Sequence, residues 1–120
     1  MNTINSLTNS SQAAKIWQIV TMIPTGHVCS YGKVADLAGL PGRARYVSRA
    51  LKLAPESLTL PWHRVVNSQG KISLPFGSPV YQQQISRLRE EGVTVHHGRV
   101  NMTLYQWRPD IAALVLDIPF

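Results

Sequence analysis

The feature that most constrains the fold is a short helix joined by a tight turn to a longer helix with a basic face. Ser30 is a predicted N-cap for a helix over residues 31–38, and Gly39 ends that helix. Residues 40–42 form a turn, and the longer helix is predicted over residues 43–54. This order of elements is typical of a helix-turn-helix, in which the longer helix is the recognition helix.

The predicted helix over residues 43–54 has one apolar face and one basic face. The apolar face, at helical spacing, consists of Ala44, Val47, Leu51 and Ala54. The opposite face consists of Arg45, Ser48, Arg49 and Lys52. No acidic residue occurs between Ala38 and Pro55, whereas an ordinary solvated face mixes charges of both signs. The sequence therefore predicts that the basic face binds DNA.

The rest of the chain predicts one domain around this unit. Residues 1–11 are polar and are interpreted as a flexible N-terminal tail, and residues 12–120 are interpreted as a single domain. A chain of 120 residues can bury one core but is too short for two. A helix is predicted over residues 12–23 from its apolar spacing, and Pro24 ends it.

Short strands are predicted beyond the basic helix. Residues 64–66 and 71–74 are β-type segments separated by the turn 67–70, so we expect them to pair as a small hairpin or wing. A further helix is predicted over residues 80–91, and the apolar segment 111–120 is expected to lie back on the body. The predicted fold class is mainly α: a winged helix-turn-helix DNA-binding domain with a small β hairpin.

Composition excludes some classes of protein and favours others. The chain is 44% hydrophobic, and no apolar run approaches the ~20 residues of a membrane helix, so we expect no membrane partner. The formal charge is +6, and eight of the twelve basic residues are arginine, which suits contacts with phosphates and bases. We expect a monomer in the cytoplasm, associated with the nucleoid if the source is bacterial.

Residues that bind metals are few. Cys29 is the one cysteine, which excludes an internal disulfide and any zinc site built on two cysteines. His96 and His97 are adjacent and point apart on an extended chain, and His27 lies in a predicted surface turn. We therefore expect neither a metal nor a cofactor.

The segment with the most chemical content is residues 61–66, Pro-Trp-His-Arg-Val-Val. If residue 62 were cysteine, His63 would be placed to activate it as a nucleophile. Residue 62 is tryptophan, and its indole has an N–H donor but no nucleophilic lone pair. Trp62 can stack, fill a pocket and donate one hydrogen bond, so the sequence predicts recognition without covalent chemistry at this position.

These residues resemble the active-site motif of the O6-alkylguanine-DNA alkyltransferases, Pro-Cys-His-Arg-Val, with tryptophan in place of the cysteine. That replacement is the hallmark of the alkyltransferase-like proteins. Residues 26–32 resemble the family's segment before the helix-turn-helix, and residues 43–50 resemble its recognition helix. Residues 87–92 resemble the end of the helix that carries a functional glutamate. The resemblance covers nearly the whole chain after residue 11.

The resemblance implies a role for each matching residue. Tyr31 would push on a phosphate and rotate the target nucleotide, and Arg45 would enter the duplex and fill the space left by the flipped base. Trp62 would line the lesion pocket. His63 and Glu91 would hold that pocket by hydrogen bonds, as remnants of the relay that activates the enzymes' cysteine. The loop that closes over the flipped base would consist of Leu74, Pro75, Phe76, Gly77 and Ser78.

Two positions depart from the enzymes' pattern. Ala54 replaces an asparagine that follows their recognition helix, so the bracing of the next loop should differ. The loop at residues 74–77 lacks their Asn-Tyr-Ser sequence, so contacts with the alkyl group should differ as well.

The resemblance implies a non-enzymatic sensor of DNA damage with no catalytic residue. Such a protein would bind and flip O6-alkylguanine in double-stranded DNA, direct it to nucleotide excision repair proteins, and block alkyltransferase at the same lesion. Two alternatives stay open. One is an alkyltransferase that uses Cys29, and the other is a sequence-specific winged-helix DNA-binding regulator.

Overall fold

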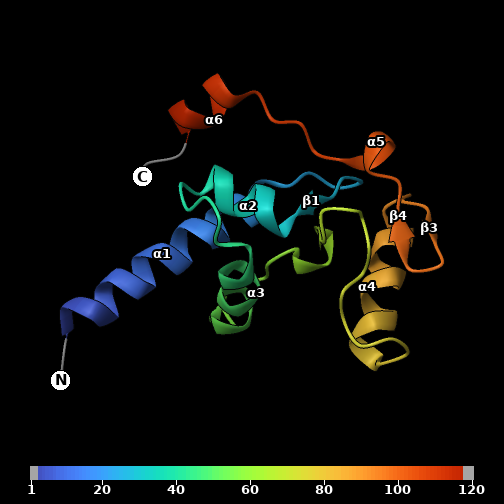
Figure 1. The fold of residues 1–120 in the computed structure, drawn as a ribbon, viewed down its shortest axis with the longest axis horizontal. Coiled ribbons are helices and arrows are strands. Elements are labelled where there is room, and N and C mark those ends of the chain that lie inside the picture. The colour runs from blue at the N-terminus through green and yellow to red at the C-terminus, as the bar shows by residue number, and fades with distance from the viewer. Residues whose placement is uncertain (1–2, 118–120) are drawn as a thin grey trace.

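The computed structural model describes the backbone of residues 3–117 and the side chains of residues 12–116. Within these limits the fold is mainly helical (Figure 1), which confirms the predicted class. In chain order its elements are α1 (Thr3–Met22), β1 (Cys29–Ser30), α2 (Tyr31–Leu37), α3 (Ala44–Leu53), the 3-10 helix η1 (Trp62–Arg64), β2 (Val65–Val66), α4 (Pro79–Glu90), β3 (Val95–His96), β4 (Arg99–Val100), α5 (Met102–Tyr105) and α6 (Ile111–Asp117).

The first helix is longer than the sequence predicts. α1 begins at Thr3, so the prediction of a flexible tail over residues 1–11 is wrong for residues 3–11, which are helical. Residues 1–2 lie outside the described part. Neither proline nor glycine occurs before Pro24, so no residue forces the helix to start as late as residue 12.

The helix-turn-helix forms as its caps predict. The Ser30 hydroxyl accepts a hydrogen bond from the backbone N–H of Lys33 at 3.1 Å, which caps α2. At the other end Gly39 has a φ of +77°, a conformation that favours glycine, and its N–H donates to the carbonyl of Asp36. α3 then packs on α1, where the Trp17 indole donates to the Ala50 carbonyl at 2.7 Å.

The prediction that residues 64–66 pair with residues 71–74 in a hairpin is wrong. β2 pairs in parallel with β1, so that Cys29 lies opposite Val65. Val65 and Val66 are both buried, so both faces of β2 are covered. A strand of this kind pairs with another strand inside the body of the protein. The small hairpin of this fold is instead β3–β4, with Val95 opposite Val100, and Lys71 makes only an isolated bridge to Arg99.

Two clusters of buried side chains divide the interior. One lies among α1, α2 and α3, and the other lies between α4, β2 and the β3–β4 hairpin. The C-terminal chain runs back across the molecule to α6, where Leu114 joins the first cluster (Figure 1). The other side chains described in α6 are exposed, so the expected packing of residues 111–120 is confirmed only for Leu114; residues 118–120 lie outside the described part. Within residues 3–117, no helix combines the length and apolar character needed to cross a membrane.

Candidate nucleic-acid interface

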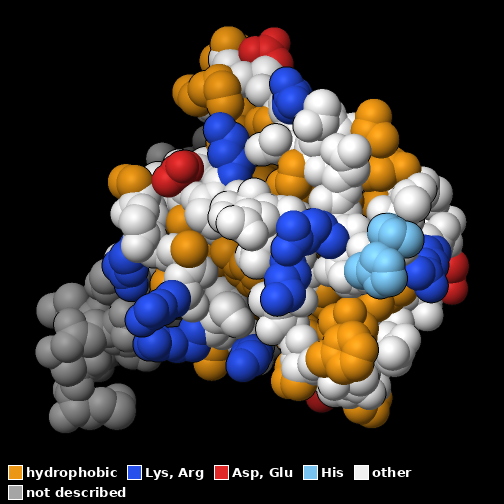
Figure 2. Space-filling view, turned by 45° about the vertical axis from the view of Figure 1, so that its right-hand side comes forward, with side chains coloured by type: hydrophobic (Ala, Val, Ile, Leu, Met, Phe, Trp, Pro, Cys, Tyr) orange, Lys and Arg blue, Asp and Glu red, His pale blue; other side chains and the backbone are white. Residues whose placement is uncertain are grey.

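The outer face of α3 carries exposed cations, as predicted. Arg45, Arg49 and Lys52 are exposed, and Ser48 beside them is half-buried. In the described part of the chain, no carboxylate forms an ion pair with any of the three cations. Figure 2 shows a group of Lys and Arg side chains in the lower left of that view. Free guanidinium and ammonium groups on a helix that faces solvent are suited to a polyanion.

Tyr31 and Arg45 come from different helices but line the same hollow. This hollow has a volume of about 410 Å³ and is lined by Tyr31, Gly32, Ala44, Arg45, Ser48, Asn67, Ser68 and Ser73. The Ser73 hydroxyl donates to the Tyr31 hydroxyl at 3.4 Å, which holds the ring at the rim. The two residues to which the resemblance assigns nucleotide rotation and base replacement therefore face one hollow.

Trp62 forms one wall of a pocket between the two buried clusters. The pocket has a volume of about 250 Å³ and is lined by Tyr31, Ser48, Leu51, Lys52, Trp62, Leu74, Val80 and Gln84. Its walls are mostly apolar, with a few polar groups and one cation at the edge, a composition that suits a flat polar ring. Because α2 and α3 supply half of this lining, the pocket opens directly beside the recognition helix.

Gln84 fixes the segment that carries Trp62. Its side chain is 2% exposed, and its amide donates to the carbonyls of His63 at 3.0 Å and Val65 at 2.9 Å. These bonds tie η1 and β2 to α4. Gln84 is not among the site residues predicted from sequence, although its position three residues after the inward-facing Tyr81 marks it as part of the buried face.

Glu91, at the C-terminal end of α4, is the centre of a hydrogen-bond network. His63 Nε2 donates to Glu91 Oε2 at 2.6 Å, and Arg64 donates from Nε and from Nη2, the latter at 2.8 Å. The Gly26 N–H donates to Glu91 Oε1 at 2.9 Å. Arg64 also donates to the carbonyl of Ile23, so the network joins α4, η1 and the end of α1.

This network sets the charge state of Glu91. Burial tends to raise the pKa of the carboxyl, but the donors from Arg64, Gly26 and His63 outweigh it and lower that pKa to about 2. Glu91 is therefore an anion at neutral pH. Arg64 was not predicted to have a role, because its partner is distant in sequence.

His63 and Glu91 lie behind the pocket and do not line it. The predicted hydrogen bond between them is present, but the pocket wall is formed by Trp62 and Gln84. His63 Nδ1 is buried and has no hydrogen-bond partner among the described residues. The pair therefore braces η1 from the side of the body.

The loop at residues 74–77 reaches the pocket only through Leu74. Pro75, Phe76 and Gly77 are exposed and are not part of the pocket wall, so their predicted place in the lesion pocket is corrected for this structure. Phe76 is 90% exposed, and its ring lies 5.3 Å from that of Tyr81. At the end of the loop, the Ser78 hydroxyl caps α4 by accepting a hydrogen bond from the backbone N–H of Tyr81.

The sequence matches the family described as 6-O-methylguanine DNA methyltransferase, DNA binding domain, over residues 11–93. The chain belongs to this family. It is 50% identical over 94 residues to the DNA base-flipping protein of Escherichia coli (strain K12), an alignment that covers 78% of this chain and 71% of the relative. It is 39% identical over 100 residues to alkyltransferase-like protein 1 of Schizosaccharomyces pombe, covering 79% and 93%.

A solved structure has the same fold. It is the crystal structure of S. pombe Atl1 in complex with damaged DNA containing O6-carboxymethylguanine. The two structures superpose with a TM-score of 0.75 and 37% sequence identity, over 83% of this chain and 97% of that chain. The alkyltransferase-like resemblance and the helix-turn-helix fold are thereby confirmed.

Cys29 of this methyltransferase-family domain is shielded from reaction. It is fully buried in β1, and burial raises the pKa of its thiol to about 12. Only the thiolate is a nucleophile, and at pH 8 a pKa of about 12 leaves about one thiolate in ten thousand. This observation argues against the alternative of an alkyltransferase that uses Cys29 as its nucleophile. The described residues also contain no cluster of three His, Cys, Asp or Glu side chains suited to a metal ion.

We expect a thiol reagent to label Cys29 far more slowly in the folded protein than in the unfolded chain. The pKa difference alone predicts a rate about a thousand times lower at pH 8. Labelling followed by mass spectrometry, with and without denaturant, measures this ratio. Similar rates in both states would show that Cys29 is accessible and would reopen covalent chemistry.

Proposed function

We propose that this domain binds O6-alkylguanine in double-stranded DNA and rotates the damaged nucleotide into the Trp62 pocket without removing the alkyl group. The observation that carries the proposal is Trp62 itself. It forms the wall of a pocket that adjoins a basic recognition helix, at the position that resembles the enzymes' cysteine. The base-flipping name of the E. coli relative and the damaged DNA bound to S. pombe Atl1 support it.

The energetics of base flipping favour a damaged guanine. Extrusion of a base costs a few kcal/mol, and the cost is lowest for a base that already pairs badly, as O6-alkylguanine does. Arg45 beside the pocket is placed to fill the vacated stack, and cations on α3 are placed to bind phosphates. Trp62 then offers the flipped base a flat apolar surface on which to stack.

The second part of the proposal follows from the tryptophan at position 62, where the enzymes have their nucleophilic cysteine. An indole cannot accept an alkyl group, and Cys29 is buried with a raised pKa. A protein that holds the lesion without reacting shields its O6 substituent from an alkyltransferase. The lesion stays in the DNA, so its removal requires an excision pathway, and we propose nucleotide excision repair proteins as the partners.

The deciding experiment compares two duplexes at matched salt. One contains a single O6-methylguanine and the other is unmodified, and fluorescence anisotropy gives the affinity for each. We expect tighter binding to the modified duplex, because flipping costs less there. Equal affinities would overturn the proposal. Tight binding to one particular undamaged sequence would instead support the winged-helix regulator.

We expect Arg45→Ala to weaken binding to the O6-methylguanine duplex about tenfold. The side chain that replaces the flipped base is removed, and a loss of about 1.4 kcal/mol corresponds to that factor. Arg108→Ala is the matched control, since it removes an exposed arginine that lies between α5 and α6 and lines neither the Trp62 pocket nor the hollow shared by Tyr31 and Arg45. Equal affinity of the Arg45→Ala variant and the wild type would contradict the assigned role of Arg45.

A further inference from the structure

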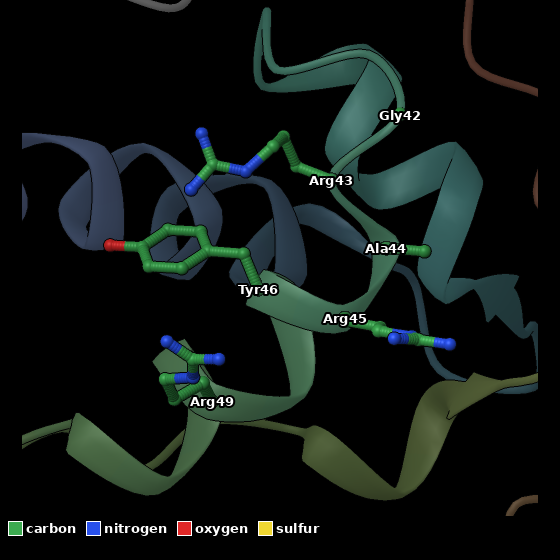
Figure 3. A pocket seen from close by; sticks show the side chains of 6 residues that line it. All are labelled: Gly42, Arg43, Ala44, Arg45, Tyr46 and Arg49. Atoms are coloured by element: carbon green, nitrogen blue, oxygen red, sulfur yellow. The ribbon is translucent and has the colours of Figure 1, made fainter.

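A second basic hollow lies at the start of α3. It has a volume of about 490 Å³ and is lined by Gly42, Arg43, Ala44, Arg45, Tyr46 and Arg49. Figure 3 shows Arg43, Tyr46 and Arg49 directed to one side of the helix, while Arg45 points away from them. We call Arg43, Tyr46 and Arg49 the Arg43 flank. Arg43 and Tyr46 are not among the DNA-binding residues predicted from sequence.

The Arg43 flank lies across α3 from the Trp62 pocket. Ser48, Leu51 and Lys52 line the pocket, and none of them lines the hollow of the Arg43 flank. Successive residues of a helix turn by about 100°, which places residues 46 and 49 on the side opposite residues 48 and 51. α3 therefore presents one flank to the pocket and another to the arginine hollow, with Arg45 on the ridge between them.

The chemistry of the Arg43 flank suits a phosphate. The Arg43 guanidinium carbon lies 4.9 Å from the centre of the Tyr46 ring, so the planar donor group is held in place before any ligand arrives. Arg43 and Arg49 are exposed, and within residues 12–116 neither forms an ion pair with a carboxylate. An ordered guanidinium fork binds phosphate oxygens with paired hydrogen bonds.

We propose that the Arg43 flank binds the backbone of the undamaged DNA strand. A helix that enters a groove of duplex DNA has one sugar–phosphate backbone on each side. The flipped nucleotide comes from the damaged strand, so the pocket flank of α3 faces that strand. The opposite flank, with Arg43 and Arg49, then faces the other backbone. This inference rests on the proposed function, since it takes the Trp62 pocket as the site of the flipped base.

This assignment gives the two strands different anchors. Tyr31 and Lys52 lie at the pocket and act on the strand that is distorted. Arg43 and Arg49 hold the strand that stays stacked, so that it is fixed while its partner base leaves. Arg45, on the ridge between the two flanks, is the residue that enters the gap.

The experiment removes charge from the protein and from one DNA strand at a time. The variant is Arg43→Gln/Arg49→Gln, and the duplexes contain O6-methylguanine with neutral methylphosphonate linkages in the undamaged strand, the damaged strand or neither. On the all-phosphate duplex we expect a loss of affinity of about tenfold. The slope of log K against log salt should also fall by about 1.8, since each phosphate contact contributes about 0.9. On the duplex neutralised in the undamaged strand this loss should vanish, and neutralising the damaged strand should leave it intact.

A second double variant, Arg99→Gln/Arg108→Gln, removes the same charge from exposed positions on β4 and before α6. We expect it to bind within about twofold of the wild type, which separates a local contact from net charge. The proposal is overturned if the flank variant binds DNA normally, as a site for an acidic protein would require. The proposal is also overturned if the variant's loss of affinity vanishes on the duplex neutralised in the damaged strand. The same holds if that loss is equal on every duplex.

A failure of the proposed function would be detected in a different comparison, that of the wild-type protein on two duplexes. The wild-type protein would then bind the O6-methylguanine duplex and the unmodified duplex equally. The strand-specific loss is a difference between variants on one duplex and does not enter that comparison. Circular dichroism of each variant checks that the exposed substitutions leave the helices formed.

Discussion

Glu91→Ala should lower the free energy of unfolding by about 3 kcal/mol. The carboxylate accepts hydrogen bonds from His63, Arg64 and the Gly26 N–H, and its side chain is only 13% exposed. Its removal leaves the Arg64 guanidinium without its counter-charge in a mostly buried site, and breaking such a pair costs ~3–5 kcal/mol. Urea unfolding monitored by circular dichroism at pH 7 measures the difference between the variant and the wild type.

The same residue predicts a dependence of stability on pH. The pKa of Glu91 falls from 4.5 to about 2 on folding, a shift that corresponds to about 3 kcal/mol. Because the folded pKa is the lower one, this stabilisation is fully present above about pH 4.5 and is lost as the pH falls through about 2. The stability difference between wild type and Glu91→Ala should therefore shrink as the pH is lowered from 5 towards 2.

Glu90 provides the matched control. It is the adjacent glutamate, is exposed, and within residues 12–116 it forms no ion pair. Glu90→Ala should change the free energy of unfolding by less than about 0.5 kcal/mol, with no change in its pH dependence. Equal losses in the two variants would mean that the network around Glu91 does not stabilise the fold.

The helix-turn-helix could be predicted from sequence because its signals are local. The Ser30 cap, the Gly39 stop and the basic outer face of α3 each depend on residues within a few positions of one another. The bounds of α2 and α3 agree with the prediction to within about one residue for the same reason. α1 shows the limit of such signals, because the polar character of residues 3–11 predicts a tail although no residue there breaks a helix.

The errors concern contacts between distant segments. β2 contains two adjacent valines, and nothing next to them in sequence tells whether they pair with residues 71–74 or with β1. Arg64 and Gln84 owe their roles to partners that are 19 or more positions away. Their side chains are polar and would be expected at the surface, so burial with hydrogen-bond partners could not be inferred from the chain alone.

The candidate site depends both on local sequence signals and on contacts between distant segments. The motif around Trp62 predicted a pocket and the hydrogen bond between His63 and Glu91, and the structure contains both. The motif could not show that this pair lies behind the pocket, nor that residues 75–77 lie outside its wall. Those facts depend on how α4 is placed against η1, and the hydrogen bonds of Gln84 and Glu91 that join the two elements link residues distant in sequence.

The largest loss of lesion recognition is expected for Trp62→Ala. Trp62 is half-buried and forms a wall of the pocket, and the Arg87 guanidinium carbon lies 5.4 Å from its ring centre. Stacking of a base on an aromatic ring contributes ~1–3 kcal/mol, so affinity for the O6-methylguanine duplex should fall about 30-fold. Binding to unmodified DNA rests on phosphate contacts and should change little, which makes the ratio of the two affinities the quantity to measure.

Two variants separate stacking from other effects of this substitution. Trp62→Phe keeps a flat ring but loses the indole N–H, so it should restore most of the affinity if stacking dominates. Phe76→Ala removes an aromatic ring that lies outside the pocket wall and is 90% exposed, so its effect should stay within about threefold. A loss with Phe76→Ala as large as with Trp62→Ala would mean that the loop at residues 74–77 closes over the base. If Trp62→Ala left the ratio of affinities for the modified and unmodified duplexes unchanged, the flipped base would bind elsewhere. Tryptophan at position 62 would then serve only to prevent alkyl transfer.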